Sequence, residues 1–481
     1  MPPKNIYEDN TDFSTPVTSQ SSTSTVSSQQ VSLPAVPPHK KTFPKIFIFI
    51  GAGLVVLVLL ILVVKLILSS KNGASGQITW WGLWEDPATV TPLINAYQAS
   101  HPGVKISYIN QSQQDYRERL TSALAKGNGP DIFTFHNSWV PMFRSDLDTL
   151  PTGVMNPADF AKTFYPTAAS DLTSGNSIVG IPLEYDALML FVNEDIFKKA
   201  GKTPPTTWDD FRTTACELTT KDDQGNITQA GAALGRTENV DQWQEILALM
   251  MIQNNVDLAN PTGKNAEGAL KFFTQFSQDA ACNGGGNVWD VTQPPSTQAF
   301  ASGKLAMYVG PSWRYFEIQQ ANHDLNFTTA PIPQLPKDDP NQLDIDYATY
   351  WSQGVWAKSK NKAVAWDFLK YLSTQASLQK MFESESLVRG FGEPYPRVDM
   401  ASLLKDHPFL GPLISQAPGA QSWFLASRTF DGPTGINSQL SNYFGDAVNA
   451  VADSKQSVTD ALATCAQGVA QVLSQYKLTV K

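Results

Sequence analysis

Histidine, cysteine and motifs for covalent catalysis are all scarce in this chain of 481 residues. No cysteine pair stands at a metal-ligand spacing, and neither do the five histidines, which are His39, His101, His136, His323 and His407. The sequence also lacks a G-x-S-x-G nucleophile motif and a phosphate-binding glycine loop. We therefore expect no metal, no cofactor and no enzyme activity. A glycosidase pair of carboxylates stays open because acids are frequent, but no single acid stands out.

Positive charge is in deficit as well. The chain has 35 Lys and Arg against 44 Asp and Glu, a formal net charge of -9. No basic patch with interleaved aromatic residues is present, so the composition argues against a nucleic-acid partner. The length and the 42% content of hydrophobic residues are sufficient for two or more lobes with their own cores.

Three cysteines leave few covalent options. No cysteine precedes Cys216, which excludes a lipid-modified cysteine near the N-terminus. Outside the cytoplasm Cys216 and Cys282 could pair, and closing so long a loop would contribute about 4 kcal/mol in the chain-entropy model. Two buried free thiols are the equally weighted alternative. Cys465 lies in a helical pattern and is expected to be packed.

One long apolar run dominates the N-terminal part. Residues 45–68 carry almost no charge and at about 1.5 Å per residue can cross a hydrocarbon core of about 30 Å, so we predict a transmembrane anchor there. Residues 1–44, rich in Ser, Thr, Pro and Gln, are expected to be a disordered tail, and 69–76 a flexible linker.

The lysines that precede this run orient it. Lys40, Lys41 and Lys45 favour a cytoplasmic N-terminus and an extracytoplasmic main domain in a single-pass protein of the cell membrane. Lys65 and Lys71, on the far side, weaken the asymmetry.

From residue 77 the pattern alternates between strands and helices. Strands are expected at "QITWW", "VKISYI" and "PDIFTF", with a helix after Asp86 and Pro87 and another over roughly 113–126. "TTWDDF" carries a capping box at Thr207. This alternation predicts an α/β fold with a parallel sheet.

Aromatic residues stand beside polar ones after several expected strands. The stretches are "WWGLWED", "FHNSW", "LEYDA", "GPSWRYF" and "YATYWSQG". In an open α/β sheet ligands bind at the carboxyl ends of the strands. Rings cover the apolar faces of a sugar, while carboxylates and amides bind its hydroxyls. For any single Trp, a place in the core is an equal alternative to ligand contact.

Five stretches give the chain a family resemblance. "ITWWGLWED", "LAKGNGPDIFTF", "IPLEYDALMLFVNEDIFKKAGKTPPTTWDDF", "AFASGKLAMYVGPSW" and "AVADSKQSVTDALATCAQGV" together resemble the family 1 extracellular solute-binding proteins of ABC importers, the maltose-binding-like sugar receptors. The chain departs from the family pattern at Val192-Asn193, where Tyr-Asn is usual, and in the missing lipid-anchoring cysteine.

The resemblance implies a two-lobed periplasmic-binding-protein type II fold with a hinge. The first lobe would comprise 77–184 with 334–376, and the second 185–333 with 377–481. A ligand would lie between the lobes. By position in the matching motifs, the expected contacts are Trp84, Glu85, Phe135, His136, Asn137, Tyr185, Asp186, Ser312, Trp313, Tyr350, Trp351, Arg389 and Asn442.

The function expected from this resemblance is capture of a carbohydrate, preferably an oligosaccharide, and its delivery to the permease subunits of an ABC transporter. Two alternatives are a ligand-sensing module of the same fold and an extracytoplasmic glycan-cleaving enzyme. The 44 residues before the anchor hold no catalytic domain, which counts against direct signalling.

Overall fold

The computed structural model describes residues 75–337 and 339–478. The predicted tail, the predicted anchor at 45–68 and nearly all of the predicted linker lie outside these residues. No helix in the described ranges is both long and apolar enough to span a membrane.

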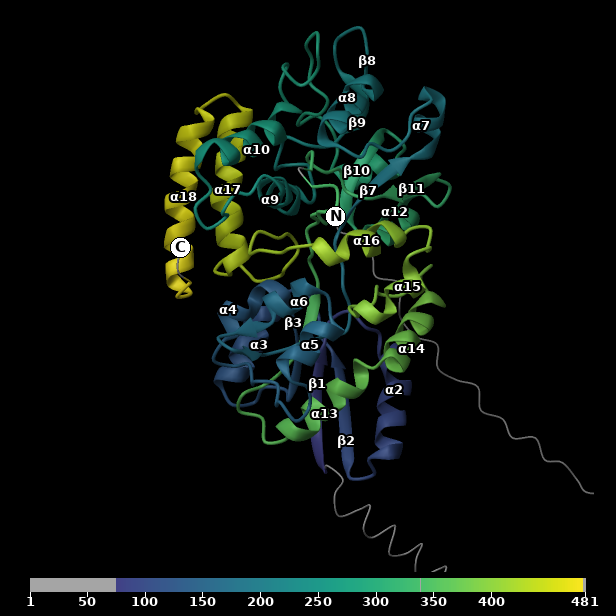
Figure 1. Ribbon diagram of the computed structural model, residues 1–481, viewed down its shortest axis with the longest axis vertical. Coiled ribbons are helices and arrows are strands. Elements are labelled where there is room, and N and C mark those ends of the chain that lie inside the picture. Colours follow the sequence, from purple (N-terminus) through teal and green to yellow (C-terminus); the bar gives the residue numbers. More distant parts are fainter. Residues whose placement is uncertain (1–74, 338, 479–481) are drawn as a thin grey trace, which may run out of the picture. The chain divides into compact units, whose positions relative to one another are not determined.

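Two mixed five-stranded sheets organise the unit that begins at Asn72 (Figure 1). The first has the order β2-β1-β3-β12-β6, and its strands are β1 Gly76–Gly82, β2 Val104–Asn110, β3 Ile132–His136, β6 Ile181–Pro182 and β12 Trp351–Val355. The second has the order β11-β7-β10-β9-β8, and its strands are β7 Leu188–Asn193, β8 Thr220–Lys221, β9 Ile227–Ala232, β10 Leu305–Pro311 and β11 Phe327–Ala330. A small hairpin joins β4 Thr173–Ser174 and β5 Ser177–Ile178.

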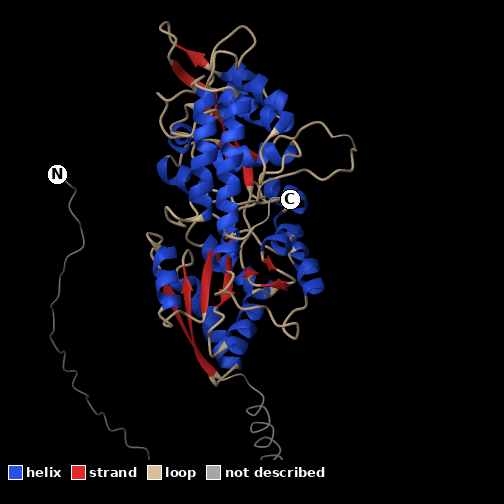
Figure 2. Cartoon of the chain, turned by 90° about the vertical axis from the view of Figure 1, so that its left-hand side faces the viewer, coloured by secondary structure: helices blue, strands red, loops and turns tan. Residues whose placement is uncertain are grey.

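We call the parts built on these sheets the first and second lobes. Helices flank the strands in both (Figure 2). The α-helices up to α9 are α2 Pro87–Ser100, α3 Tyr116–Ala125, α4 Val140–Phe143, α5 Pro157–Thr163, α6 Pro166–Asp171, α7 Glu194–Ala200, α8 Trp208–Leu218 and α9 Trp243–Gln253. The later ones are α10 Gly263–Gln275, α11 Ser296–Ala301, α12 Arg314–Ala321, α13 Lys362–Leu372, α14 Gln375–Ser386, α15 Ala401–Leu404, α16 Gly411–Gln416, α17 Ile436–Ala452 and α18 Val458–Gln475. Short 3-10 turns occupy Asn137–Trp139, Val398–Met400 and Ala417–Gly419.

The predicted parallel order holds for β1, β2 and β3, which pair in parallel. β12 and β6 then join antiparallel, so the first sheet is mixed rather than purely parallel. The sequence pattern misses this because β12 comes from a segment more than 200 residues further along the chain than β3 and shows no local signal of its partner.

Local sequence explains where α2 begins and how the loop before it is held. Asp86 caps the helix by accepting from the N–H of Ala88 at 2.7 Å, and Pro87 follows at the first helical position, as expected. The Tyr108 hydroxyl donates to the carbonyl oxygen of Glu85 at 2.6 Å. A Cβ at Gly82 would meet the Tyr108 hydroxyl at 2.1 Å and its ring at 2.3 Å, so only glycine allows this close approach.

Chain segments that run between the lobes form a small ladder. The segment from β6 to β7 and the segment from β11 to β12 meet at a bridge between Ala187 and Ala348. Tyr347 pairs in turn with Gln421. The N–H of Thr349 donates to the carbonyl oxygen of Asp186 at 2.9 Å, and the N–H of Ala348 to that of Gln421 at 2.8 Å. These pairings hold the crossing segments together.

The expected boundary after residue 376 falls inside α14, which begins at Gln375. α14 packs on α2 and α13 of the first lobe, whereas α16 packs on β7 of the second. We therefore propose that the first lobe extends through α14, and that the chain returns to the second lobe before α16.

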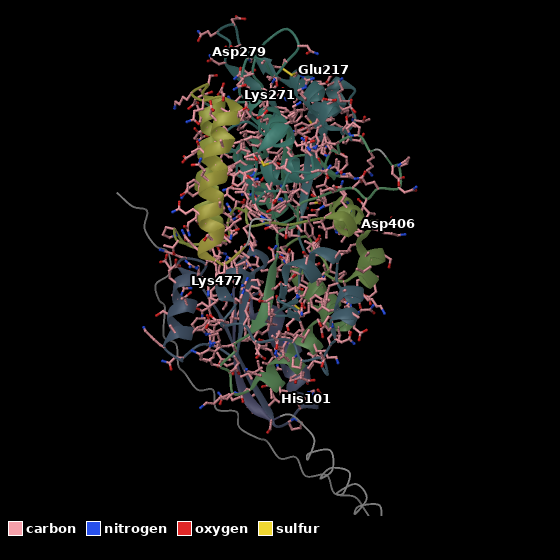
Figure 3. The ribbon with its side chains drawn as sticks, turned by 60° about the vertical axis from the view of Figure 1, so that its left-hand side comes forward. His101, Glu217, Lys271, Asp279, Asp406 and Lys477 are labelled. Carbon is pink, nitrogen blue, oxygen red and sulfur yellow. A yellow bond between two sulfur atoms is a disulfide. The ribbon has the colours of Figure 1, made fainter. Side chains whose placement is uncertain are left out.

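Cys216 and Cys282 form a disulfide in the second lobe, which selects the first of the two alternatives left open by the sequence. The bond joins the end of α8 to the loop after α10 and closes a separation of 66 residues. Figure 3 shows it beside Glu217, near the end of the second lobe that is remote from His101. Cys465 is a buried free thiol on α18, as expected.

Candidate functional site

A cavity of about 340 Å³ lies at the crossing of the two lobes. Its volume falls in the range of small-ligand sites. Aromatic and charged side chains share its wall, and the lining residues are Trp84, Gln113, His136, Glu184, Asp186, Glu245, Pro311, Trp313, Phe316, Glu317, Thr349, Tyr350, Trp351, Arg389, Glu393, Ser427, Arg428 and Phe430. They come from strand ends, from the crossing segments, from α9 and α12, from the chain after α14 and from the chain between α16 and α17.

Tryptophans form the aromatic part of the first-lobe wall. Trp84, in the loop after β1, meets Trp351 at the start of β12 edge-on, with ring centroids 5.4 Å apart. Trp351 in turn contacts His136 at 5.1 Å and Trp139 at 5.4 Å. Phe430 approaches Trp84 at 5.9 Å from the segment before α17. The wall is therefore a set of aromatic rings in mutual contact, with Trp139 buried beneath those that line the cavity.

His136 is held as a neutral polar group within this wall. Its ring nitrogens lie 2.7 Å from Ser138 Oγ and 3.0 Å from Thr349 Oγ1. Burial lowers the pKa of His136 to about 3, so the imidazole is uncharged near neutral pH. It can orient a ligand through hydrogen bonds but adds no positive charge.

Trp313 provides the aromatic platform of the second-lobe wall. The guanidinium groups of Arg314 and Arg428 lie 4.4 and 4.9 Å from its ring centroid. Both arginines pair with Glu317, Arg428 at 2.7 Å. These contacts fix the orientation of the ring before any ligand arrives.

Asp186 lies at the hinge and joins the two lobes. Its carboxylate accepts hydrogen bonds from the N–H and hydroxyl of Ser312 at 3.0 and 2.9 Å, and from the N–H of Ala187 at 2.8 Å. Burial, reinforced by the nearby charge of Glu393, raises the pKa of Asp186 to about 7. Much of its bonding capacity is used within the protein, so Asp186 organises the hinge as well as lining the cavity.

Seven of the thirteen expected contact residues line the cavity, namely Trp84, His136, Asp186, Trp313, Tyr350, Trp351 and Arg389. The other six do not, and they are Glu85, Phe135, Asn137, Tyr185, Ser312 and Asn442. We retain the first group as candidate ligand contacts, and the second group lies outside the cavity lining.

Burial or exposure explains why three of those six lie elsewhere. Phe135 is fully buried beside Gly180 and Gly354. Tyr185 is fully buried and stacks near Tyr350 at 5.5 Å. Asn442 is exposed on α17.

The remaining three support the wall from behind. Asn137 donates to Asp171 at 2.9 Å, and the hydroxyl of Tyr350 donates to the same carboxylate at 2.9 Å. The hydroxyl of Ser312 donates its hydrogen bond to the carboxylate of Asp186. Glu85 is buried behind Trp84 with 5% of its surface exposed.

The sequence indicated some of the additional lining residues and gave no sign of others. Glu184, Phe316 and Thr349 fall inside the aromatic and polar stretches after strands. Glu245 on α9 and Arg428 before α17 lie outside every such stretch. Only the tertiary arrangement brings them to the cavity.

The described residues include no group of three or more His, Cys, Asp or Glu arranged to hold a metal ion. The polar groups of the cavity are carboxylates, guanidiniums, hydroxyls, the carboxamide of Gln113 and one neutral imidazole. Together with the rings, they can bind a polyhydroxylated ligand by stacking and hydrogen bonding.

Solved structures share this fold. The sugar-binding protein MalE from Xanthomonas citri matches with a TM-score of 0.66 at 18% identity, covering 84% of this chain and 98% of that one. The cyclic alpha-maltosyl-1,6-maltose binding protein from Arthrobacter globiformis matches with a TM-score of 0.67 at 19% identity, covering 83% and 100%. The chain therefore has the two-lobed α/β fold of solute-binding proteins.

Sequence comparison identifies the family. A maltotriose-binding protein from Pyrococcus abyssi is 21% identical over 376 residues, or 73% of this chain and 78% of that protein. The family profile described as "Bacterial extracellular solute-binding protein" matches residues 81–378, more than half of the 481 residues. The chain belongs to the bacterial extracellular solute-binding protein family.

Proposed function

We propose that this protein captures a carbohydrate between its two lobes and delivers it to an ABC permease. The observation that carries this proposal is a cavity lined from both lobes by tryptophan rings beside carboxylates and guanidiniums. Similar proteins named for maltotriose and for cyclic maltosyl-maltose support a sugar over other solutes. The same relatives are named as binding proteins, which favours binding over catalysis.

Hinge closure is the mechanism we propose for capture. A ligand that touches both walls favours the closed form by its differential binding free energy. A shift from mostly open to mostly closed needs about 5.5 kcal/mol of such difference. Stacking on Trp84, Trp313 and Trp351 at about 1 kcal/mol each, together with several hydrogen bonds, supplies it.

We also propose that residues 45–68 anchor the protein in the cell membrane, with the N-terminus cytoplasmic and the main domain outside. The extracellular character of the family supports that placement of the main domain. A tether keeps the captured ligand close to the permease and raises its effective concentration there.

Thermal shift of residues 77–481 against a panel of oligosaccharides tests the proposal. We expect at least one sugar to raise the melting temperature, and Trp313→Ala to abolish that rise because it removes the second-lobe platform. Asn442→Ala is the matched control, since Asn442 is exposed on α17 and away from the cavity. Full retention of binding in Trp313→Ala would refute the assigned platform, and new reducing ends in the mixture would indicate cleavage instead.

A further inference from the structure

The first-lobe wall carries an imbalance of charge beside the cavity. Arg389 Nη2 lies 2.9 Å from Glu385 Oε2 and 2.7 Å from Glu393 Oε1. Glu85 and Glu184 are close enough to this group for their charges to act on it. One guanidinium therefore pairs with two carboxylates and lies within electrostatic range of two more.

Burial makes this imbalance costly. Glu85, Glu184 and Glu385 have only 5%, 8% and 5% of their surface exposed. Burial, and then the repulsion from Glu393 and Glu85, raises the pKa of Glu184 well above its ordinary value. Burial and Glu393 likewise raise the pKa of Glu385 to about 7. The cluster thus has a single cation, Arg389, which is too few to stabilise all four carboxylates in their ionised form.

Two members of the cluster face the cavity itself. Glu184 and Glu393 line it, whereas Glu85 and Glu385 do not. Glu184 Oε1 accepts from the N–H of Trp351 at 3.2 Å, which places this carboxylate directly beside the aromatic wall. A cationic group in the cavity would therefore meet both carboxylates and rings.

The other charged residues of the cavity do not neutralise the excess of carboxylates. On the opposite wall Glu317 pairs with both Arg314 and Arg428. His136 is neutral because burial lowers its pKa. Among the residues that the structure describes at this cavity, both lining arginines are thus already bound to carboxylates.

Glu245, on the second-lobe wall, has a buried carboxylate oxygen to which no described residue donates a hydrogen bond. Glu245 has 2% of its surface exposed and lines the cavity. Its Oε1 accepts from the N–H and hydroxyl of Ser427 at 2.6 and 2.8 Å. Its Oε2 has no hydrogen-bond partner within the described part of the chain. A buried carboxylate oxygen left without a donor points to a ligand that supplies one.

We propose that the sugar bound here carries free ammonium groups, so that the ligand is an oligosaccharide of amino sugars rather than a neutral or acidic one. This inference rests on the proposed function, because it specifies the carbohydrate of the same cavity. An ammonium offers three donors and a full charge to Glu184 and Glu393. The ring faces of Trp84 and Trp351 add cation–π attraction. A uronic acid would bring a further negative charge to a wall that already holds too many.

Calorimetric titration of the full-length protein in detergent tests this inference. The four probes are oligomers of equal length built from glucosamine, N-acetylglucosamine, glucose and galacturonic acid, at about pH 6 where the amines are protonated. We expect the glucosamine oligomer to bind at least about tenfold more tightly than the neutral oligomers, and the galacturonic acid oligomer most weakly. Repeating the titration in buffers of different ionisation enthalpy should show proton release with the glucosamine oligomer alone, because the bound cation lowers the pKa of the carboxyls.

Charge-removing variants separate a local contact from the general field of the protein. Glu184→Gln should weaken the glucosamine oligomer about tenfold and the glucose oligomer by a clearly smaller factor, because the amide keeps a hydrogen-bonding oxygen and loses only the charge. Glu217→Gln is the matched control, because it removes one negative charge on α8, near the end of the second lobe that is remote from the cluster (Figure 3). Its affinity for the glucosamine oligomer should equal that of the wild type. Melting temperatures of both variants check that they fold.

The outcomes distinguish this inference from the proposed function. Binding of glucose or N-acetylglucosamine oligomers as tightly as the glucosamine oligomer would overturn the amino-sugar inference and leave carbohydrate capture intact. An equal loss of affinity in Glu184→Gln and Glu217→Gln would also overturn it, since the effect would then come from overall charge. Failure of every oligosaccharide to bind would overturn both.

Discussion

At the scale of single residues, Asp186 both holds the crossing segment and lines the cavity. The pH dependence of stability tests the structural role. Its folded-state pKa of about 7 lies above its ordinary value, so the folded state holds the proton more tightly than the unfolded state does. Stability is then lost as the pH rises from about 4 to about 7, by at most about 4 kcal/mol for this group.

Asp186→Asn should flatten that part of the pH dependence. The amide keeps an oxygen for the N–H of Ser312 and carries no charge at any pH. We expect the wild type to lose several kcal/mol of stability relative to the variant between about pH 4 and pH 7, measured by urea unfolding of residues 72–481. A constant difference between the two proteins over this range would show that the ionisation of Asp186 does not oppose folding.

The residues that sequence reasoning could place are those tied to a strand end. Trp84 follows β1, Trp351 begins β12, and Asp186 precedes β7, so each stands where a strand begins or ends. Arg428 gives no such signal, because it comes from irregular chain before α17. Its backbone has a φ of 49°, a left-handed value that its residue type does not suggest.

At the scale of elements, the loop between β1 and α2 depends on the contact of Gly82 with Tyr108. Gly82→Ala would bring a methyl group onto the Tyr108 ring, which packs against Trp80 at 4.7 Å and has little room to move. We expect a loss of about 1–3 kcal/mol in stability and a weaker affinity, because Trp84 shifts with the loop. Denaturation and titration of the same variant measure both effects. Gly153→Ala is a control with open space at the new methyl group.

The disulfide between α8 and the loop after α10 is a second element-scale device. Cys216→Ser with Cys282→Ser should lower the unfolding free energy by about 4 kcal/mol, because a closed loop of 66 residues restricts the unfolded chain. Sugar affinity should remain, since neither cysteine lines the cavity. Loss of affinity with unchanged stability would contradict this assignment.

Element boundaries follow the sequence where capping residues mark them. Thr207 accepts from the N–H of Asp210 at the start of α8, as the pattern predicts. Gly201, with a φ of 65°, ends α7. The antiparallel addition of β12 to β3 and the packing of α14 on α2 are long-range choices. No local pattern encodes them, so the sheet order and the lobe boundary required the structure.

At the scale of the whole unit, contacts between the lobes meet around the cavity. Arg389, whose partner Glu385 is on α14 of the first lobe, lies over the Phe316 ring of α12 at 4.9 Å. Arg117 on α3 donates to the carbonyl oxygen of Asp431 at 2.9 Å, while Ser427 in the same segment donates to Glu245 of the second lobe. The segment before α17 therefore touches both lobes and can report on their separation.

Ligand binding should reduce the radius of gyration of residues 72–481. Rings of both lobes enclose the cavity, so a ligand that stacks on Trp84 and Trp313 together stabilises the closed arrangement. Small-angle X-ray scattering with and without saturating sugar measures the change. Trp313→Ala should show no contraction, because a ligand held by one lobe alone gives no preference for closure. An unchanged radius in a wild-type protein that binds sugar fully would mean that the two walls are already closed without ligand, and the stacking energy would then contribute only to affinity.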